Sequence, residues 1–127
     1  MINPEVQNVT LAVVRVPAVS EWNVYLINKN DVPLENTLVA SKGYGEKDGQ
    51  KQNTSILRHF LETVPPQGTA LIEPIHPAVF HLNNEYWVSY YIGSQLYDKR
   101  FLFVPDTICE ENLTFIKELD MEGVLHS

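Results

Sequence analysis

The chain has 127 residues, 44% of them hydrophobic and 20% charged, which is the size and composition of one globular domain with a core of its own. Its formal net charge is −7 and its basic residues are scattered. Neither nucleic acid nor an anionic membrane surface is an expected partner, because both are bound mainly through Lys and Arg. The only cysteine is Cys109, so an intrachain disulfide is excluded and a reducing, cytoplasmic location is expected.

Residues 1–5 lack the basic start and the apolar run of a secretory signal. The longest apolar runs, such as residues 11–14, are far shorter than the roughly 20 residues that a membrane-spanning helix needs. The sequence therefore predicts a protein without a membrane-embedded segment.

Three stretches in the first third of the chain are typical of β-strands. Residues 7–16 are rich in β-branched side chains and end before Pro17, residues 21–28 alternate along the chain, and residues 35–41 resume β character after a polar turn. We expect the last two stretches to pair as an antiparallel hairpin. Residues 43–53 hold three glycines and almost no apolar side chain, which predicts a solvated loop.

Residues 54–64 fit both an apolar helical stripe and one side of a strand, so periodicity alone does not decide between them. A Pro-Pro-Gln-Gly turn and another β-like run, residues 69–74, follow at once, and this context favours a strand. We expect Pro74 and Pro77 to mark a bend or an edge where the chain changes sheets.

Residues 85–104 give the clearest prediction, an antiparallel hairpin. The dipeptide Gly93-Ser94 lies between two strongly β-like runs and suits a two-residue type II′ turn. Farther along, Asp106 or Thr107 is predicted to cap a short helix, or else a loosely packed tail follows the sheet.

About seven β-like runs separated by turns, without alternating helices, predict an all-β fold. We expect one domain over residues 1–127, an immunoglobulin-like antiparallel β-sandwich of about seven strands with a short C-terminal helix or tail. The Cys-Trp-Cys spacing of antibody domains is absent, so the term describes the architecture alone.

Three stretches carry a resemblance to a group of known proteins. They are WNVYLINKNDVPLENTLVASKGYG at 22–45, LRHFLETVPPQGTALIE at 57–73 and NNEYWVSYYIGSQLYDKRFLFV at 83–104. Together they resemble short, uncharacterised bacterial proteins that often bear the name phenylalanyl-tRNA synthetase subunit alpha. The resemblance covers most of the chain, including its ending MEGVLHS. The name implies binding of ATP, phenylalanine and tRNA.

The residues themselves disfavour that synthetase activity. A class II synthetase core needs a far longer chain and arginines in extended motifs, whereas Arg15, Arg58 and Arg100 each stand alone in a β-like run. A chain of net charge −7 also offers no evident surface for tRNA.

The most metal-like cluster of residues is His76 and His81 with Glu73 and Glu85 nearby. Their spacing matches no standard zinc motif, and two histidines an odd number of residues apart point to opposite faces of a regular strand. Ordinary surface or turn histidines are favoured. The alternative is a small-ligand-binding, metal-binding or enzymatic domain around His76 to Glu85, which requires convergent polar groups around a pocket.

Other candidates for chemistry are weaker. Cys109 has no neighbouring base and is predicted to be a half-buried structural residue. His59, next to Arg58, has no serine, carboxylate or second histidine at an informative spacing and is predicted to be a partly exposed strand residue. The glycines of 43–53 match neither a phosphate-binding nor a calcium-binding loop. No catalytic, cofactor-binding or metal-binding residue is therefore predicted, and no cofactor.

The strand around Trp87 has bulky side chains on both faces, where a sandwich strand usually has one polar face. Tyrosine and tryptophan on an outer face are typical of interface cores. Either a partner or the chain's own segment 108–125 covers them, and the sequence does not decide which. The leading prediction is a non-enzymatic interaction or assembly module that uses a sheet face or edge, as a homodimer or with an unidentified protein. The predicted interface residues are Tyr86, Trp87, Tyr91 and Tyr97.

Overall fold

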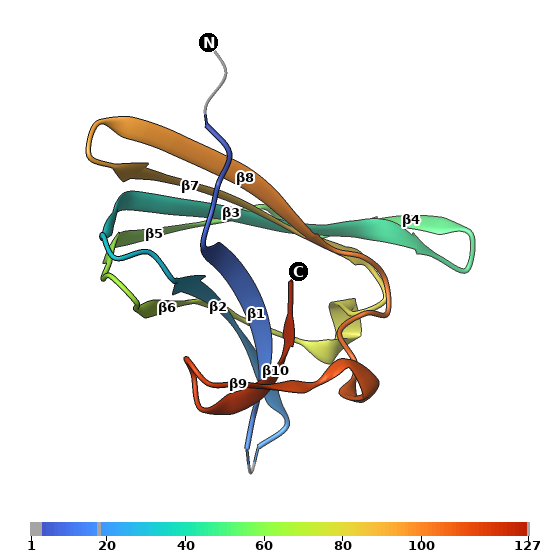
Figure 1. Ribbon diagram of the computed structural model, residues 1–127. Coiled ribbons are helices and arrows are strands. Elements are labelled where there is room, and N and C mark those ends of the chain that lie inside the picture. Colours follow the sequence, from blue (N-terminus) through green and yellow to red (C-terminus); the bar gives the residue numbers. More distant parts are fainter. Residues whose placement is uncertain (1–3, 18, 127) are drawn as a thin grey trace.

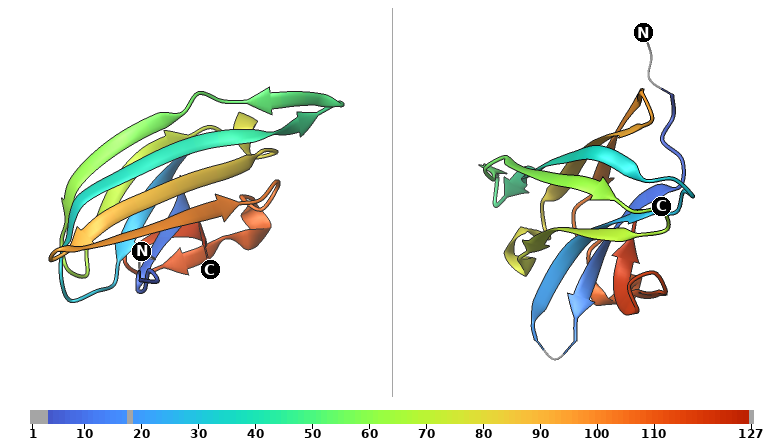
Figure 2. Two further views of the ribbon diagram at one scale, coloured as in Figure 1. Left: turned by 90° about the horizontal axis from the view of Figure 1, so that it is seen from above. Right: turned by 90° about the vertical axis from the view of Figure 1, so that its left-hand side faces the viewer.

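The computed structural model describes residues 4–17 and 19–126. Within them the chain forms ten β-strands and two short 3-10 turns, and every strand pairing is antiparallel. The strands form two sheets of five strands each that pack face to face (Figure 1; Figure 2). The predicted all-β sandwich is confirmed, whereas the immunoglobulin-like arrangement stays a prediction.

Sheet A has the strand order β6-β2-β1-β10-β9. Its strands are β1 (Val9–Val16), β2 (Glu21–Asn28), β6 (Thr69–Ile75), β9 (Thr114–Ile116) and β10 (Met121–Leu125). Sheet B has the order β4-β3-β7-β8, with β5 also paired to β3. Its strands are β3 (Leu34–Lys47), β4 (Gln50–Asn53), β5 (Leu57–Val64), β7 (Asn83–Ile92) and β8 (Gln95–Phe103). Because β3 is 14 residues long, one edge of it accommodates both β5 and β4.

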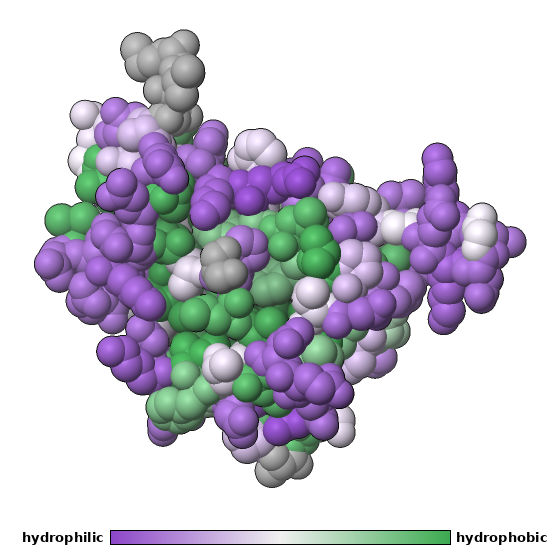
Figure 3. Space-filling view, turned by 45° about the vertical axis from the view of Figure 1, so that its right-hand side comes forward, coloured by the Kyte–Doolittle hydropathy of each residue, from purple (hydrophilic) through white to green (hydrophobic). Residues whose placement is uncertain are grey.

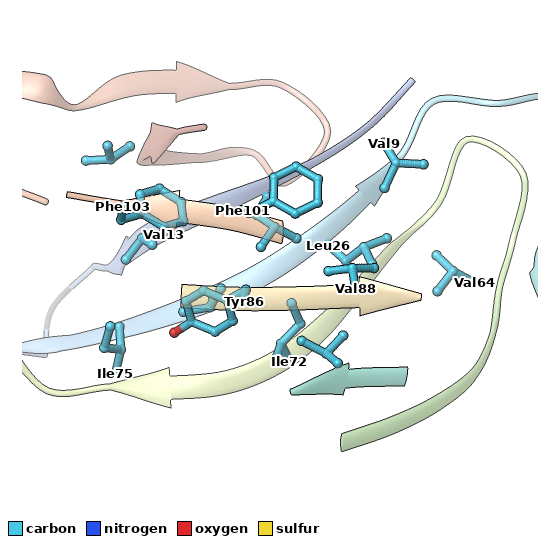
Figure 4. Close-up of a cluster of buried hydrophobic side chains, with 14 of the residues drawn as sticks. Val9, Val13, Leu26, Val64, Ile72, Ile75, Tyr86, Val88, Phe101 and Phe103 are labelled. Carbon is cyan, nitrogen blue, oxygen red and sulfur yellow. The ribbon is translucent and has the colours of Figure 1, made fainter. Parts of the chain in front are cut away.

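The main core lies between the two sheets and follows directly from strand alternation. Every second residue of β1 and β2 points inward, as do Tyr86 and Val88 of β7 and Phe101 of β8, and these side chains are buried (Figure 4). Burial of such apolar surface contributes about 25 cal/mol per Å², so the interior is the main source of stability.

A second, smaller cluster lies on the outer face of sheet A. Ala12, Val14 and Ile27 alternate with the inward residues of β1 and β2, yet they are buried, because Ile116 packs against them. Gly123 makes this close approach possible. A Cβ atom at that position would lie 2.8 Å from Val14 Cγ1 and 2.9 Å from Ile116 Cδ1.

The predicted hairpin of residues 21–28 and 35–41 is wrong. Strand β2 pairs with β1 and β6 in sheet A, whereas 35–41 lies in β3 of sheet B. The chain crosses between sheets here, and buried Asn28 holds the crossing in place. Its Nδ2 donates to the carbonyls of Val32 at 3.0 Å and Pro65 at 2.9 Å. These bonds to a distant turn replace the local pairing that we expected.

Residues 43–53 are solvated, as predicted, but the prediction of a loop without strands is wrong. The end of β3 and the short β4 form a hairpin that projects from the sandwich (Figure 1). Its turn is Asp48-Gly49, with φ angles of 54° and 78°, and positive φ at both central residues defines the type I′ turn that Asp-Gly favours. The side chains of β4 are exposed, so the low apolar content reflects a solvated hairpin.

The C-terminal helix or tail is the third prediction that the structure overturns. After a 3-10 turn at Glu110–Asn112, the chain forms β9 and β10, and β10 pairs with the open edge of β1. Pairing satisfies the backbone groups of that edge, which a tail would leave to solvent. With β4, β9 and β10 added to the expected runs, the described residues form ten strands rather than about seven.

Other predictions for the second half are confirmed. Residues 57–64 form a strand, and β7 and β8 form the expected hairpin around Gly93, whose φ is 61°. Strand β6 is an edge strand of sheet A, and the chain then enters sheet B through a 3-10 turn at Pro77–Val79. Pro74 and Pro77 thus mark an edge and a change of sheet, as predicted.

Candidate functional site

The edge of the sandwich where β6 meets sheet B carries a partly buried polar cluster around Glu73. Its Oε1 accepts hydrogen bonds from Ser41 Oγ and His59 Nε2, both at 2.7 Å. Its Oε2 accepts one from the hydroxyl of Tyr86 at 3.1 Å. Since Glu73 belongs to sheet A and its three partners belong to sheet B, the cluster joins the two sheets. We call these four residues the Glu73 cluster.

The chemistry of the Glu73 cluster determines which group donates the proton in each of its hydrogen bonds. A carboxylate only accepts hydrogen bonds, so His59 carries a proton on Nε2. Burial, then the negative charge of Glu73 and the hydrogen bond to it, raises the pKa of Tyr86 well above its usual range. The tyrosine therefore stays protonated and donating. Ser41 likewise directs its hydroxyl proton to Glu73.

A cavity of about 200 Å³ lies beside this cluster. Ser41 and Tyr86 are buried, whereas Leu57 and His76 are exposed, so the first two lie at the closed end and the other two nearer the mouth. The cavity is lined by Ser41, Leu57, Glu73, Ile75, His76 and Tyr86, among other residues. A pocket with convergent polar groups therefore exists next to the region that the second hypothesis named.

The predicted metal-like group is not assembled. His76 caps the 3-10 turn, with its Nδ1 accepting from the backbone N–H of Ala78 at 3.0 Å. His81 bonds to Gln52 at 2.6 Å, and Glu85 lies on the outer face of sheet B. Only Glu73 and His76 of the four line the cavity. Among the described residues, no three His, Cys, Asp or Glu side chains could together hold a metal ion.

The remaining two candidates for chemistry behave in different ways. Cys109 is partly buried, as predicted. His59 is a partly exposed strand residue, also as predicted, but it has a carboxylate partner that we did not foresee. Glu73 is 14 residues away in sequence and on the other sheet. The only available signal was that Glu73 is a charged residue within the mainly apolar strand β6.

The outer face of sheet B, which points away from the core, carries large apolar side chains that the described residues, 4–17 and 19–126, leave uncovered. Trp87 is 47% exposed, and Tyr91 is exposed on the same strand. On neighbouring strands, Leu38 is 50% and Phe60 is 56% exposed, and these two residues are direct cross-strand partners. Leu38 also pairs with Ser89 of β7, which points to the same face as Trp87 and Tyr91. Paired residues share a face, so all four side chains belong to one surface. We call Leu38, Phe60, Trp87 and Tyr91 the aromatic patch.

The structure divides the four predicted interface residues. Trp87 and Tyr91 lie together on the outer face of sheet B, but Tyr86 is buried in the core. Tyr97 stacks on buried Tyr90 on the inner side, with ring centroids 5.4 Å apart. Leu38 and Phe60 were missed, although each precedes a second bulky residue, just as Trp87 precedes Val88.

The segment 108–125 does not cover the aromatic patch. It forms β9 and β10, which belong to sheet A, so that alternative for Trp87 and Tyr91 is wrong. Coverage by a partner stays a prediction.

Charges divide the outer face of sheet B into two ends. Lys42, Arg58 and Arg100 lie at one end together with Glu85, which pairs with Lys42 at 3.7 Å and Arg100 at 3.2 Å. Three positive charges and one negative charge leave this end at +2. Glu35 and Asp98 lie toward the other end, where Tyr91 is found, and give it −2. The aromatic patch runs along the face from the positive end, near Trp87, to the negative end, near Tyr91.

The opposite edge of the sandwich, where β8 faces β10, is closed by His126. Figure 3 shows hydrophobic residues in the middle of this side of the molecule with hydrophilic residues around them. A hollow here is lined by residues of β8 and β10, among them Leu102, Val124 and His126. The His126 ring packs edge-on against Phe101 and Phe103, and its Nε2 accepts from the backbone N–H of Leu102 at 3.4 Å. Burial, then the charge of Lys99, lowers the pKa of His126. A neutral imidazole therefore holds this edge together.

Fold and surface together define an all-β sandwich with a polar cluster at one edge and an uncovered aromatic patch on one face. No family model, curated protein or solved structure matches the chain. The resemblance to proteins named as a phenylalanyl-tRNA synthetase subunit stays a prediction. The residues that the structure describes include no helix long and apolar enough to cross a membrane.

Proposed function

We propose that this protein is a non-enzymatic assembly module, and that the outer face of sheet B binds the same face of a second copy of the chain. The observation that carries this proposal is the aromatic patch, in which Leu38, Phe60, Trp87 and Tyr91 form one exposed surface across three paired strands. A contiguous exposed apolar surface of this kind is a mark of an interaction site, and aromatic residues are enriched at interface cores.

The charge distribution favours a second copy as the partner. A two-fold axis that lies in the interface and runs perpendicular to the strands reverses the strand direction. It places the +2 end of one copy over the −2 end of the other. Symmetric dimers use the same patch on both subunits, and complementary potentials align the two faces. An axis parallel to the strands would place like charges together instead.

The size of the face sets the expected strength. Strands β5, β3, β7 and β8 lie about 4.8 Å apart and rise about 3.3 Å per residue, so the face is on the order of 20 Å by 30 Å. Two such faces bury on the order of 1,200 Å² in total, which is near the lower end of the area that stable interfaces bury. We therefore expect a dimer with a Kd on the order of micromolar. We place it in the cytoplasm, because a lone cysteine fits a reducing compartment.

Light scattering on a sizing column, from about 1 to 200 µM protein, tests this proposal. We expect a mass that rises with concentration from 14.5 kDa, the mass of one chain, toward twice that value. Trp87→Gln should hold the mass at one chain over the same range. Phe115→Gln is the matched control, because Phe115 is 64% exposed but lies on β9 of the other sheet. A strictly monomeric wild-type chain, or equal effects of the two substitutions, would contradict the proposal.

A further inference from the structure

We propose that the cavity beside Glu73 binds a small organic ammonium ion with an apolar body. The closed end of the cavity presents acceptors rather than donors. Ser41 and Tyr86 both direct their hydroxyl protons to Glu73, so the oxygen lone pairs of these groups are what remains for a ligand. A carboxylate can accept about four hydrogen bonds, and three are assigned to Glu73. An N–H donor complements this arrangement.

Charge selects a cation over a neutral donor. Glu73 contributes a negative charge that is largely shielded from water, its side chain being only 12% exposed, and charge interactions are stronger in such surroundings. The one lysine along the cavity, Lys42, directs its ammonium group to Glu85 on the outer face of sheet B. His59 contacts Glu73 but is not among the residues that line the cavity. An ammonium group therefore has a favourable place, and a carboxylate group does not.

The walls and the volume define the rest of the ligand. Leu57, Ile75 and Val79 supply apolar surface along the cavity. An apolar cavity of about 150 Å³ is enough to hold benzene, and this one measures about 200 Å³. The ligand class is therefore a primary amine about the size of benzylamine, with its ammonium group on Glu73 and its ring against the apolar walls.

This inference does not depend on the proposed dimer. The cavity lies at the edge between β6 and sheet B, whereas the aromatic patch lies on the outer face of sheet B, and the two share none of their side chains. A monomeric protein would still be expected to bind the amine.

The test is a titration of the ¹⁵N-labelled protein, followed by amide chemical shifts, with three ligands of nearly equal shape. Benzylamine should shift the amides around Ser41, Leu57 and Ile75 with a Kd on the order of millimolar. Benzyl alcohol should bind at least about tenfold more weakly, because it lacks the charge. Benzoate should not bind. No shift at these amides with benzylamine, or equal binding of the alcohol, would overturn the proposal.

Two substitutions assign the binding to this cavity. Glu73→Gln keeps the shape and removes the charge, and it should weaken benzylamine binding by about tenfold or more. Leu57→Trp fills the mouth from the cross-strand partner of Ser41 while leaving all four side chains of the Glu73 cluster in place, and it should also abolish binding. Leu71→Trp is its matched control, since Leu71 and Leu57 are each 49% exposed but Leu71 does not line the cavity. Unchanged binding in Leu57→Trp overturns the site even if Glu73→Gln does not fold.

Discussion

The two sheets of this protein both have apolar residues on their outer faces, and they differ in what covers them. On sheet A, Val14 and Ile27 are buried because the chain's own C-terminal strands bring Ile116 over them. On sheet B, Trp87 and Phe60 remain about half exposed within the described chain. The comparison teaches that a strand with bulky side chains on both faces has two solutions. The chain supplies its own cover, or it leaves the face for a partner.

The largest effect on stability is expected where the C-terminal strands cover the outer face of sheet A. Ile116→Ala removes a buried side chain from the second cluster and should lower the free energy of unfolding by about 3 kcal/mol. Phe115→Ala, one residue away and 64% exposed, should change it by less than about 0.5 kcal/mol. Urea denaturation of both variants measures the difference. Equal effects would mean that the C-terminal strands do not cover sheet A as described.

The next largest effect on stability tests how closely β10 packs against its neighbours at Gly123. Gly123→Ala should cost about 2 kcal/mol of unfolding free energy, because its Cβ would lie within 3 Å of Val14, Ile116 and the carbonyl of Val13. Denaturation monitored by Trp22 and Trp87 fluorescence provides the value. A neutral substitution would show that the outer cluster is loosely packed.

A charge exchange sharpens the account of sheet B. Arg58→Glu should weaken dimerisation by on the order of tenfold, about 1.4 kcal/mol, because it puts an acid against the acidic end of the second copy. Arg58→Glu brings its end from +2 to 0, and adding Arg100→Glu brings it to −2. Exchanging Glu35 and Asp98 for lysine as well then brings the other end from −2 to +2 and should restore affinity, since the reversed ends again match. Sedimentation velocity gives the dissociation constants. Failure of the lysine exchanges to restore affinity would contradict the antiparallel two-fold arrangement.

The smallest effect concerns the edge that His126 closes. The pKa of His126 is below its ordinary value of 6.5 in the folded protein, so near that pH the unfolded chain binds more protons. The stability contributed by the neutral ring is present above pH 6.5 and is lost as pH falls through the lower folded pKa. We expect His126→Gln to lose part of the acid-induced fall in melting temperature. His81→Gln, on the surface, should retain it; the reverse result would show that another group controls the fall.

Much of the fold could be predicted because it depends on local patterns. β-Branched residues indicated β1, alternating side chains indicated β2, and Gly93-Ser94 between two β-like runs indicated the pairing of β7 with β8. What failed depends on distant contacts. Nothing near Asn28 indicates that its amide would bond to the carbonyl of Pro65 and send β3 to the other sheet. The strands β9 and β10 are short; β10 forms against the free edge of β1, and β9 forms against β10.

The site was harder to foresee than the fold. The Glu73 cluster brings together side chains from four strands and both sheets, so no spacing in the sequence encodes it. Two of the four residues of the aromatic patch, Trp87 and Tyr91, could be predicted from the sequence because they lie on one strand. Leu38 and Phe60 join them only through the register of β3 with β5 and β7. The Asp48-Gly49 turn carried a readable signal that our prediction of a loop did not use.

The central claim is that a second copy covers the outer face of sheet B, and the fluorescence of Trp87 reports on that face directly. Trp22 is buried in the core, so a Trp22→Phe background leaves Trp87 as the only tryptophan. As the protein is concentrated from about 0.1 to 200 µM, its emission should move to shorter wavelength and its quenching by acrylamide should fall. A solvent-exposed emission that stays constant over the whole range would contradict the claim.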